Sequence, residues 1–432
     1  MALGGGTFIT QNKILPGSYI NFVSAARATS TIGERGYAAL PIELDWGLEG
    51  EVMTIEAGDL QKNSMALFGY DYTSEKLNPL KDLFKHAKIG YLYRLNSGGV
   101  KASNDYAVAQ YSGIRGNDLR IVISEDVDQS SAFHVSTYLG DSKIDEQIVE
   151  TTAELVPNAY IGQWKEKELV ASAGIPLTGG SNKSVTGDDY QTFLNKIEAY
   201  SFNTLGCLSE ESTIKDLFVQ FTKRMRDEVG VKFQTVVHNH KADFEGVINV
   251  KNTTVEGPTA LIPWVTGASA GCEINRSNTN KTYNGAYTIH AEYTQKQLEE
   301  CIGAGEFVFH KCGDEVRVLD DINSLTSTTV DKNEDFQENQ VIRILDQIGN
   351  DIAQLFNTKY LGKVQNNASG RIAFWNEIDN YNKQLEQIQA IENYNPDDLV
   401  VEKGNDKKSV VVTNPVIPVC CMSKLYMYVV VS

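Results

Sequence analysis

The stretch from Ile214 to His238, IKDLFVQFTKRMRDEVGVKFQTVVH, contains the two patterns that decide the fold. Apolar side chains at positions 214, 217, 218, 221, 225 and 229 recur at helical spacing and predict a helix. The run from Val231 to His238 predicts a strand, and Gly246–Val250 predicts another. Because strands that alternate with helices usually pair in parallel, we expect an α/β core with a helix-flanked, mainly parallel sheet.

Two stretches closer to the N-terminus differ in their predicted secondary structure. Residues 35–95 continue the α/β pattern, with extended runs and a short helix that opens at Pro79. Residues 98–180 instead carry short β-prone runs between clusters of Asp, Asn, Gly and Ser, with almost no helical period. We therefore expect an all-β sandwich inserted into the core, with strands at 119–123, 133–139, 144–149, 160–161 and 169–170.

The final third of the chain predicts a helical hairpin. Apolar residues recur with spacing 4, 3, 4, 3 from Val341 to Leu355, and the same spacing recurs from Phe374 to Ile388. Each helix then has one apolar stripe, so the pair must pack on something else. The triplet Cys312-Gly313-Asp314 predicts a β-hairpin turn, and Gly404-Asn405-Asp406 predicts a hinge. Extended runs at 409–413, 415–418 and 425–431 predict strands.

These patterns predict a multidomain α/β (α+β) protein with six segments. They are an N-terminal arm at 1–20, the first part of the α/β core at 21–97, the inserted β-sandwich at 98–181, the second part of the core at 182–290, a C-terminal α/β domain with the helical hairpin at 291–414, and a C-terminal arm at 415–432.

Charge and composition exclude several classes of function. The 432 residues include 56 Asp and Glu against 39 Lys and Arg, a net charge of −17. Binding to nucleic acid or to anionic lipid needs the opposite sign. The sequence has no window of ~18 apolar residues and no secretory signal at its start, so we expect synthesis in a cytoplasm. Six scattered cysteines indicate reduced, packing thiols rather than a disulfide framework.

Motifs that carry chemistry are scarce, so we expect no cofactor and no metal. His238 and His240 lie at the end of a predicted strand, with Asp243 and Glu245 nearby. A metal-dependent hydrolase that uses the two histidines is one alternative, whereas a solvated strand end explains the pair more simply. The small residues at 267–271 lack the pattern of a phosphate-binding loop and indicate close helix packing. The sequence has no Gly-x-Ser-x-Gly nucleophile motif.

Both ends of the chain carry extended, β-prone runs. Leu425–Val431 is β-branched and aromatic, without charge or proline, and would invite aggregation as a free edge. One interpretation is a strand in the protein's own sheet, and the other is donation of a strand to a neighbouring copy. The N-terminal run likewise either hangs free or pairs with a sheet of another molecule. If both ends pair with neighbours, the residues at subunit interfaces are Thr7, Phe8, Ile9, Thr10, Leu425, Tyr426, Met427, Tyr428, Val429, Val430 and Val431.

An ordered set of segments resembles contractile phage tail sheath proteins, especially those of Gram-positive myophages, phage-like particles and R-type bacteriocins (tailocins). One such segment alone would be weak evidence, but together the segments span nearly the whole chain. They are Arg35–Pro41 with Asp45-Trp46-Gly47, Tyr111–Leu119, Val316–Thr326, Val341–Asp346 and Met422–Met427.

The resemblance implies a non-enzymatic structural protein. Such subunits stack as six-fold rings around a rigid tail tube, and contraction of the sheath drives the tube through a bacterial envelope. The implied partners are identical copies, the tail tube protein, and baseplate and tail terminator proteins, without nucleic acid or membrane insertion. A subtilisin-like core, an outward β-sandwich and arms that join the sheets of neighbours are also implied. The particle would assemble in a bacterial host and leave by lysis; another oligomeric tail protein is a further alternative.

Three cations in this acidic chain are candidates for a surface that faces the tube. Lys359, Lys363 and Arg371 lie in or beside the loop that joins the two predicted helices. One interpretation places them against the tube, and the other leaves them as solvated helix ends.

Overall fold

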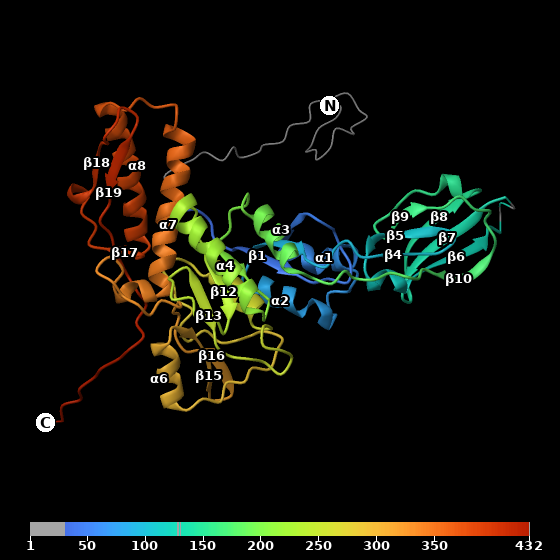
Figure 1. Ribbon diagram of the computed structural model, residues 1–432, viewed down its shortest axis with the longest axis horizontal. Helices are drawn as coiled ribbons and strands as arrows, with labels where there is room; N and C mark the ends of the chain where they lie inside the picture. The colour runs from blue at the N-terminus through green and yellow to red at the C-terminus, as the bar shows by residue number, and fades with distance from the viewer. Residues whose placement is uncertain (1–30, 128, 130, 432) are drawn as a thin grey trace, which may run out of the picture. The chain divides into compact units, whose positions relative to one another are not determined.

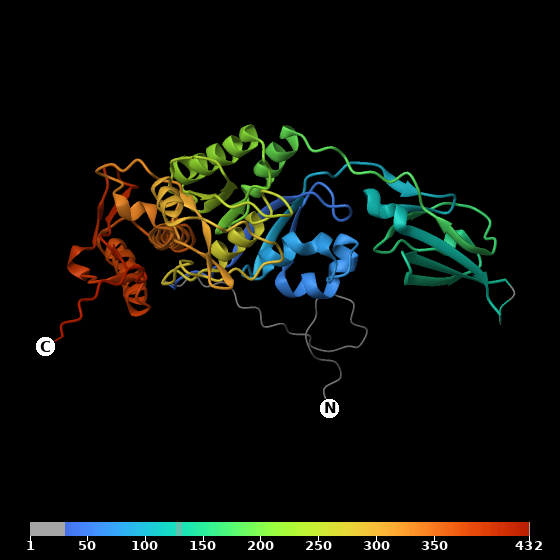
Figure 2. The same ribbon diagram turned by 90° about the horizontal axis from the view of Figure 1, so that it is seen from below.

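The computed structural model describes residues 31–127, 129 and 131–431 and divides the chain into two compact units (Figures 1 and 2). The core unit holds residues 33–350, 388–392 and those from 418 onward. The C-terminal unit holds residues 351–387 and 393–417. The expected mixed α/β, multidomain architecture is confirmed.

A seven-stranded sheet forms the centre of the core unit. Neighbouring strands are parallel except at one end, where β2 runs antiparallel to β3. The strand order is β14-β13-β12-β11-β1-β3-β2. The strands are β1 (Tyr37–Ile42), β2 (Val52–Glu56), β3 (Ile89–Arg94), β11 (Thr204–Gly206), β12 (Gln234–His238), β13 (Val247–Val250) and β14 (Glu306–Phe307).

Helices cover both faces of this sheet, as Figure 2 shows for α3 and α4 on one side and α1 and α2 on the other. On the α3–α4 face, Phe193 and Phe218 pack with Val237 and Val247 of the sheet. This is why the apolar residues after Ile214 recur at helical spacing. The helices of the core unit are α1 (Ala57–Phe68), α2 (Asn78–Phe84), α3 (Gly187–Ile197), α4 (Ser212–Arg224), α5 (Ile262–Gly271) and α6 (Gln295–Gly303).

The small-residue run at 267–271 forms the end of α5, a helix whose side chains are almost all buried. A Cβ atom on Gly267 would lie 2.2 Å from the carbonyl oxygen of Leu83, and one on Gly271 would lie 2.1 Å from that of His86. Glycine therefore allows α5 to approach the end of α2 and the residues after it. The prediction of close helix packing is confirmed.

The β-rich stretch forms two antiparallel sheets around an apolar cluster that includes Ile121, Val135 and Ile161. The expected strand at 169–170 is wrong, because the strand at this point of the chain is Ser172–Pro176. One sheet contains β4 (Lys101–Ser103), β5 (Ala107–Ser112) and β9 (Ile161–Trp164), and the other contains β10 (Ser172–Pro176), β6 (Leu119–Glu125), β7 (Phe133–Leu139) and β8 (Ser142–Val149).

The predicted hairpin around residues 312–314 is present. Strands β15 (Phe309–Cys312) and β16 (Glu315–Val318) pair in antiparallel register. The two residues of β14 belong instead to the central sheet, where they pair with β13.

Helix α7 (Asn339–Leu355) begins in the core unit, where two buried ion pairs hold it. An Nη atom of Arg343 lies 2.6 Å from a carboxylate oxygen of Asp321, and both side chains are 1% exposed. Arg226 makes a second pair with Asp346 at 2.6 Å. The predicted apolar stripe describes this part of α7 incompletely, because buried polar side chains occupy positions between its members.

The C-terminal unit packs α8 (Ala368–Gln387) on a β-hairpin of β18 (Val400–Lys403) and β19 (Val410–Thr413). Its apolar cluster includes Leu355 from the end of α7, Phe374 and Ile378 from α8, and Leu399. Gly404, Asn405 and Asp406 lie in the loop of residues 404–409 that joins β18 to β19. Asp406 accepts hydrogen bonds from the backbone N–H groups of residues 408 and 409. The role of the triplet as a hinge stays a prediction.

Short elements complete the described part of the chain. Strands β17 (Ile391–Glu392) and β20 (Ile417–Pro418) have two residues each. Single 3₁₀ or π turns cover 75–77, 114–118, 152–154, 225–229, 334–337, 356–360 and 396–398. Among the described residues, we find no helix both long and apolar enough to span a bilayer. All six cysteines lie in the described ranges and are free thiols.

Candidate assembly surfaces

The last residues of the core unit form an apolar segment that is open to solvent. We define the exposed arm as Met422–Val431; it ends at the point marked C in Figure 1. Leu425 is 85% exposed, Tyr428 95% and Val431 91%. Burial of one such side chain is worth about 1.5–3 kcal/mol, so the arm has a strong tendency to find a partner. The interpretation of residues 425–431 as a strand in the protein's own sheet is wrong, since they form no strand here.

The hairpin of the C-terminal unit offers sheet edges. In β18 and β19, Val401 pairs with Val412 and faces the apolar cluster, whereas Val400 and Val411 are exposed. Within the described ranges the two strands form a sheet by themselves. The outer edge of each strand therefore presents backbone N–H and C=O groups that a further strand can pair with. A two-stranded sheet is marginal alone, so an added strand would also stabilise it.

The candidate interface residues of the N-terminal arm, Thr7, Phe8, Ile9 and Thr10, lie outside the described residues. Their role stays a prediction.

The three candidate tube-facing cations all lie near the turn between α7 and α8, but they have different surroundings. Lys359 forms an ion pair with Glu377 at 2.8 Å. Lys363 donates to the carbonyl oxygen of Thr358, and Arg371 donates to the side-chain oxygen of Asn366 at 3.0 Å. Of the three, Arg371 alone lines the cavity beside this turn.

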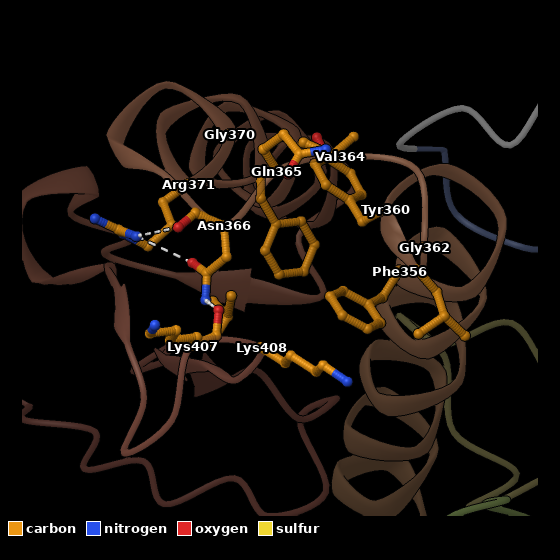
Figure 3. Close-up of a pocket in the computed structure, with 13 residues that line it drawn as sticks. Phe356, Tyr360, Gly362, Val364, Gln365, Asn366, Gly370, Arg371, Lys407 and Lys408 are labelled. Carbon is orange, nitrogen blue, oxygen red and sulfur yellow. Dashed lines mark hydrogen bonds between the residues drawn. The ribbon is translucent and has the colours of Figure 1, made fainter.

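This cavity has a volume of about 490 Å³ and lies wholly within the C-terminal unit (Figure 3). Aromatic side chains form much of its lining, with the rings of Tyr360 and Phe374 4.7 Å apart. Arg371, Lys407 and Lys408 add positive charge. We name these three cations the basic rim. The sequence analysis missed Lys407 and Lys408, which follow the turn at 404–406 and meet Arg371 only in the folded unit.

The lining of the cavity combines aromatic side chains with cations. It contains no carboxylate, histidine, cysteine or serine. Burial raises the pKa of Tyr360. An apolar group next to negative charge is the chemistry that such a lining complements.

Three of the four residues of the alternative metal site have other partners. His238 is 6% exposed and burial lowers its pKa, while His240 lies 3.1 Å from Asp216. Asp243 accepts hydrogen bonds from residues 326 and 327, and Glu245 pairs with a lysine at 2.7 Å. In the described ranges, no group of three or more His, Cys, Asp or Glu side chains is placed to hold a metal ion.

Comparisons with known families cover nearly the whole described chain. Residues 35–95 match the tail sheath protein Gp18 domain III N-terminal region, and 97–182 match the phage tail sheath protein beta-sandwich domain. Residues 183–324 match the phage tail sheath protein central domain, and 331–432 match the phage tail sheath C-terminal domain.

Two proteins of Bacillus subtilis (strain 168) resemble the chain over its full length. The uncharacterized protein YqbK is 34% identical over 98% of this chain and 99% of its own. The phage-like element PBSX protein XkdK is 32% identical over 100% of both.

Solved structures give the same result. The sheath tail protein from Desulfitobacterium hafniense superposes with a TM-score of 0.81 at 36% identity, over 93% of this chain and 100% of that one. The helical sheath of the anti-feeding prophage in its contracted state shares the fold, with a TM-score of 0.56 at 14% identity over 96% and 98%. The chain belongs to the phage tail sheath protein family. It is a structural subunit of a tail sheath.

Proposed function

We propose that copies of this chain polymerise as stacked six-fold rings around a tail tube, with the terminal arms exchanged between neighbours. The observation that carries this proposal is the exposed arm: a run of β-prone apolar residues with no strand partner among the described residues. The free edges of the β18–β19 hairpin supply a matching acceptor. Strand addition then joins a donor on one copy to an acceptor on the next.

The energetics favour such a junction despite the net charge of −17. Each backbone hydrogen bond of an added strand contributes roughly 0.5–1.5 kcal/mol net, and each large apolar side chain that it buries contributes about 1.5–3 kcal/mol. A strand of five residues therefore outweighs repulsion between exposed charges, which salt screens beyond about 10 Å.

Contraction follows if the rings have two arrangements and the contracted one is the more stable. The related anti-feeding prophage sheath is described in a contracted state, which supports this step. A gain of about 1.4 kcal/mol per subunit is already tenfold in equilibrium, so many coupled copies make the change one-way. Tube, baseplate and terminator proteins are the partners that would hold the extended state, and the tube would be driven through a bacterial envelope.

The proposed role requires no catalysis. The core would have the subtilisin-like fold of the family but not the catalytic activity of subtilisin, because a fold does not carry catalytic residues with it. The subunit would be synthesised in the host cytoplasm and become part of a phage tail or of a headless bacteriocin particle.

We also propose that the basic rim, with Lys359 and Lys363 beside it, faces the tube. The partner would present carboxylates near an apolar side chain. Reversing Lys407 and Lys408 to Glu should weaken co-sedimentation with purified tubes at low salt, whereas reversing Lys62, an exposed lysine on α1, should not. Equal binding by both variants would contradict this surface. Lys359→Glu is a poorer test, because it would repel Glu377 within the unit.

The experiment that tests the main proposal is removal of residues 421–432, followed by negative-stain microscopy. The full chain should form striated hollow tubes, and the truncated chain should stay soluble and folded by circular dichroism but form none. Tubes from the truncated chain would contradict arm exchange. Discrete small oligomers from the full chain would instead indicate another oligomeric tail protein, or an enzyme if they hydrolyse a test ester.

A further inference from the structure

The root of the exposed arm is held by one side-chain amide. Gln340, in the first turn of α7, is 3% exposed. Its Nε2 group donates to the carbonyl oxygen of Val419 at 3.0 Å, and its Oε1 atom accepts from the N–H of Cys421 at 3.0 Å. The amide thus pairs with the backbone on both sides of one residue, as a neighbouring strand would.

The surroundings of Gln340 make this contact rigid. The same segment is fixed by Val419, whose N–H donates to the carbonyl oxygen of Ala390 at 2.9 Å. Helix α7 itself is held to the core unit three residues further on, where Arg343 pairs with Asp321. Beyond Cys421, the arm has no secondary structure and its side chains are exposed. Gln340 therefore lies at the boundary between fixed and free chain.

We propose that Gln340 is a positioning residue that sets the point from which the exposed arm leaves the core unit, and so the neighbour and register that the arm can reach. This inference rests on the proposed exchange of arms. It also assigns donor and acceptor to different units, because the root belongs to the core unit and the β18–β19 hairpin belongs to the C-terminal unit.

Geometry explains why the starting point matters. The residues from Met422 to Val431 reach at most about 35 Å when fully extended. Release of residues 419–421 would lengthen the free segment by about 10 Å. A slip of one residue turns every side chain of an added strand to the opposite face, so a loose origin permits wrong registers.

The test compares two buried side-chain amides that hydrogen-bond to backbone. Asn252 in the core unit accepts from the N–H of Phe309 at 2.7 Å and donates to the carbonyl oxygens of Phe309 at 2.9 Å and His290 at 3.0 Å. Gln340→Met and Asn252→Leu each remove the hydrogen bonds of one of these amides. Hydrogen exchange in dilute protein and the lowest concentration that gives tubes are measured for each variant.

We expect Gln340→Met to speed exchange of the Cys421 amide about tenfold, as loss of one hydrogen bond does, and to raise the concentration needed for tubes at least tenfold. Asn252→Leu should change neither quantity below its unfolding temperature. If Gln340→Met does not fold, insertion of one glycine after Cys421 tests the same idea, because it shifts the register without touching α7. This insertion should abolish regular tubes.

Unchanged exchange at Cys421 would overturn the inference, and so would faster exchange with normal tube formation. Regular tubes from the glycine insertion would also overturn it. These results are distinct from failure of the proposed function, which would appear as tube formation by the chain that lacks residues 421–432.

Discussion

Strand β13 and the end of the exposed arm are built from nearly the same residues and have opposite environments. Val-Ile-Asn-Val at 247–250 is buried throughout, whereas the three valines at 429–431 are 74–91% exposed. Both runs have the side chains that favour strands. The difference is that β13 lies between β12 and β14, while the described residues offer the arm no partner strand. Composition therefore shows that a segment needs pairing, but not whether the partner belongs to the same molecule.

The largest expected effect concerns β13, the buried member of this comparison. Ile248→Ala should lower the free energy of unfolding by about 2–5 kcal/mol, because it leaves a cavity next to the central sheet. Val430→Ala should change it by less than about 0.5 kcal/mol in dilute protein, since that side chain is 88% exposed. Urea unfolding at low protein concentration measures both. A loss above about 1 kcal/mol for Val430→Ala would mean that the arm packs on its own molecule.

A charged substitution in the exposed arm tests whether the arm is buried when copies of the chain assemble. Val429→Asp should raise the concentration needed for tubes more than tenfold, an effect above about 1.4 kcal/mol, because the junction would bury an unpaired carboxylate. Its matched control is Val330→Asp, at a valine that is 102% exposed and lies outside the arm. Sedimentation of assembled material gives the values. Equal assembly by the two variants would remove the energetic basis for arm exchange.

The smallest expected effect depends on pH and concerns Glu338, which lies just before the start of α7. Burial, with Asp320 and Asp321 nearby, raises the pKa of Glu338 to about 7, and Lys424 in the exposed arm opposes this shift. The folded chain binds this proton more tightly than the unfolded chain, so the contribution of Glu338 to stability falls as pH rises from about 4.5 to about 7.

Glu338→Gln removes that dependence. The variant should be more stable than the wild type by about 1 kcal/mol at pH 8, a value discounted for the partial exposure of the carboxyl group, and should show no gain near pH 4. Urea unfolding of both chains at the two pH values gives the difference. The same gain at both values would show that the ionisation of Glu338 is not its source.

Much of the core was predictable from local pattern alone. The stripe after Ile214 and the glycines at 267 and 271 identified helices that pack on the sheet, because burial imposes a period and close approach imposes small side chains. Helix α1 was not predicted. Its buried residues are Leu60, Ser64 and Phe68, so a serine interrupts the apolar pattern.

The features that the sequence did not predict depend on contacts between residues that are far apart in the chain. The buried positions of α7 include Arg343 and Asp346, whose partners lie 22 and 120 residues earlier, and no local period indicates such pairs. The role of Gln340 could not be predicted from the sequence, because no sequence motif identifies an amide that binds backbone. The basic rim likewise requires Arg371 to meet a turn more than thirty residues later. The arm itself was predictable, because an apolar run such as residues 425–431, without charge or proline, is unusual in a segment that does not pack in a core.

The two ends of the β-sandwich lie side by side, which makes this module replaceable. The N–H of Val100 donates to the carbonyl oxygen of Ser181 at 3.0 Å, and the N–H of Ser181 donates back to Val100 at the same distance. Gly99 permits this approach, because a Cβ atom there would lie 2.0 Å from the Ser181 oxygen. A short glycine linker could close the gap after excision, and a foreign domain with adjacent termini could take the vacant place. The module could therefore be exchanged without redesign of the central sheet and helices that carry it.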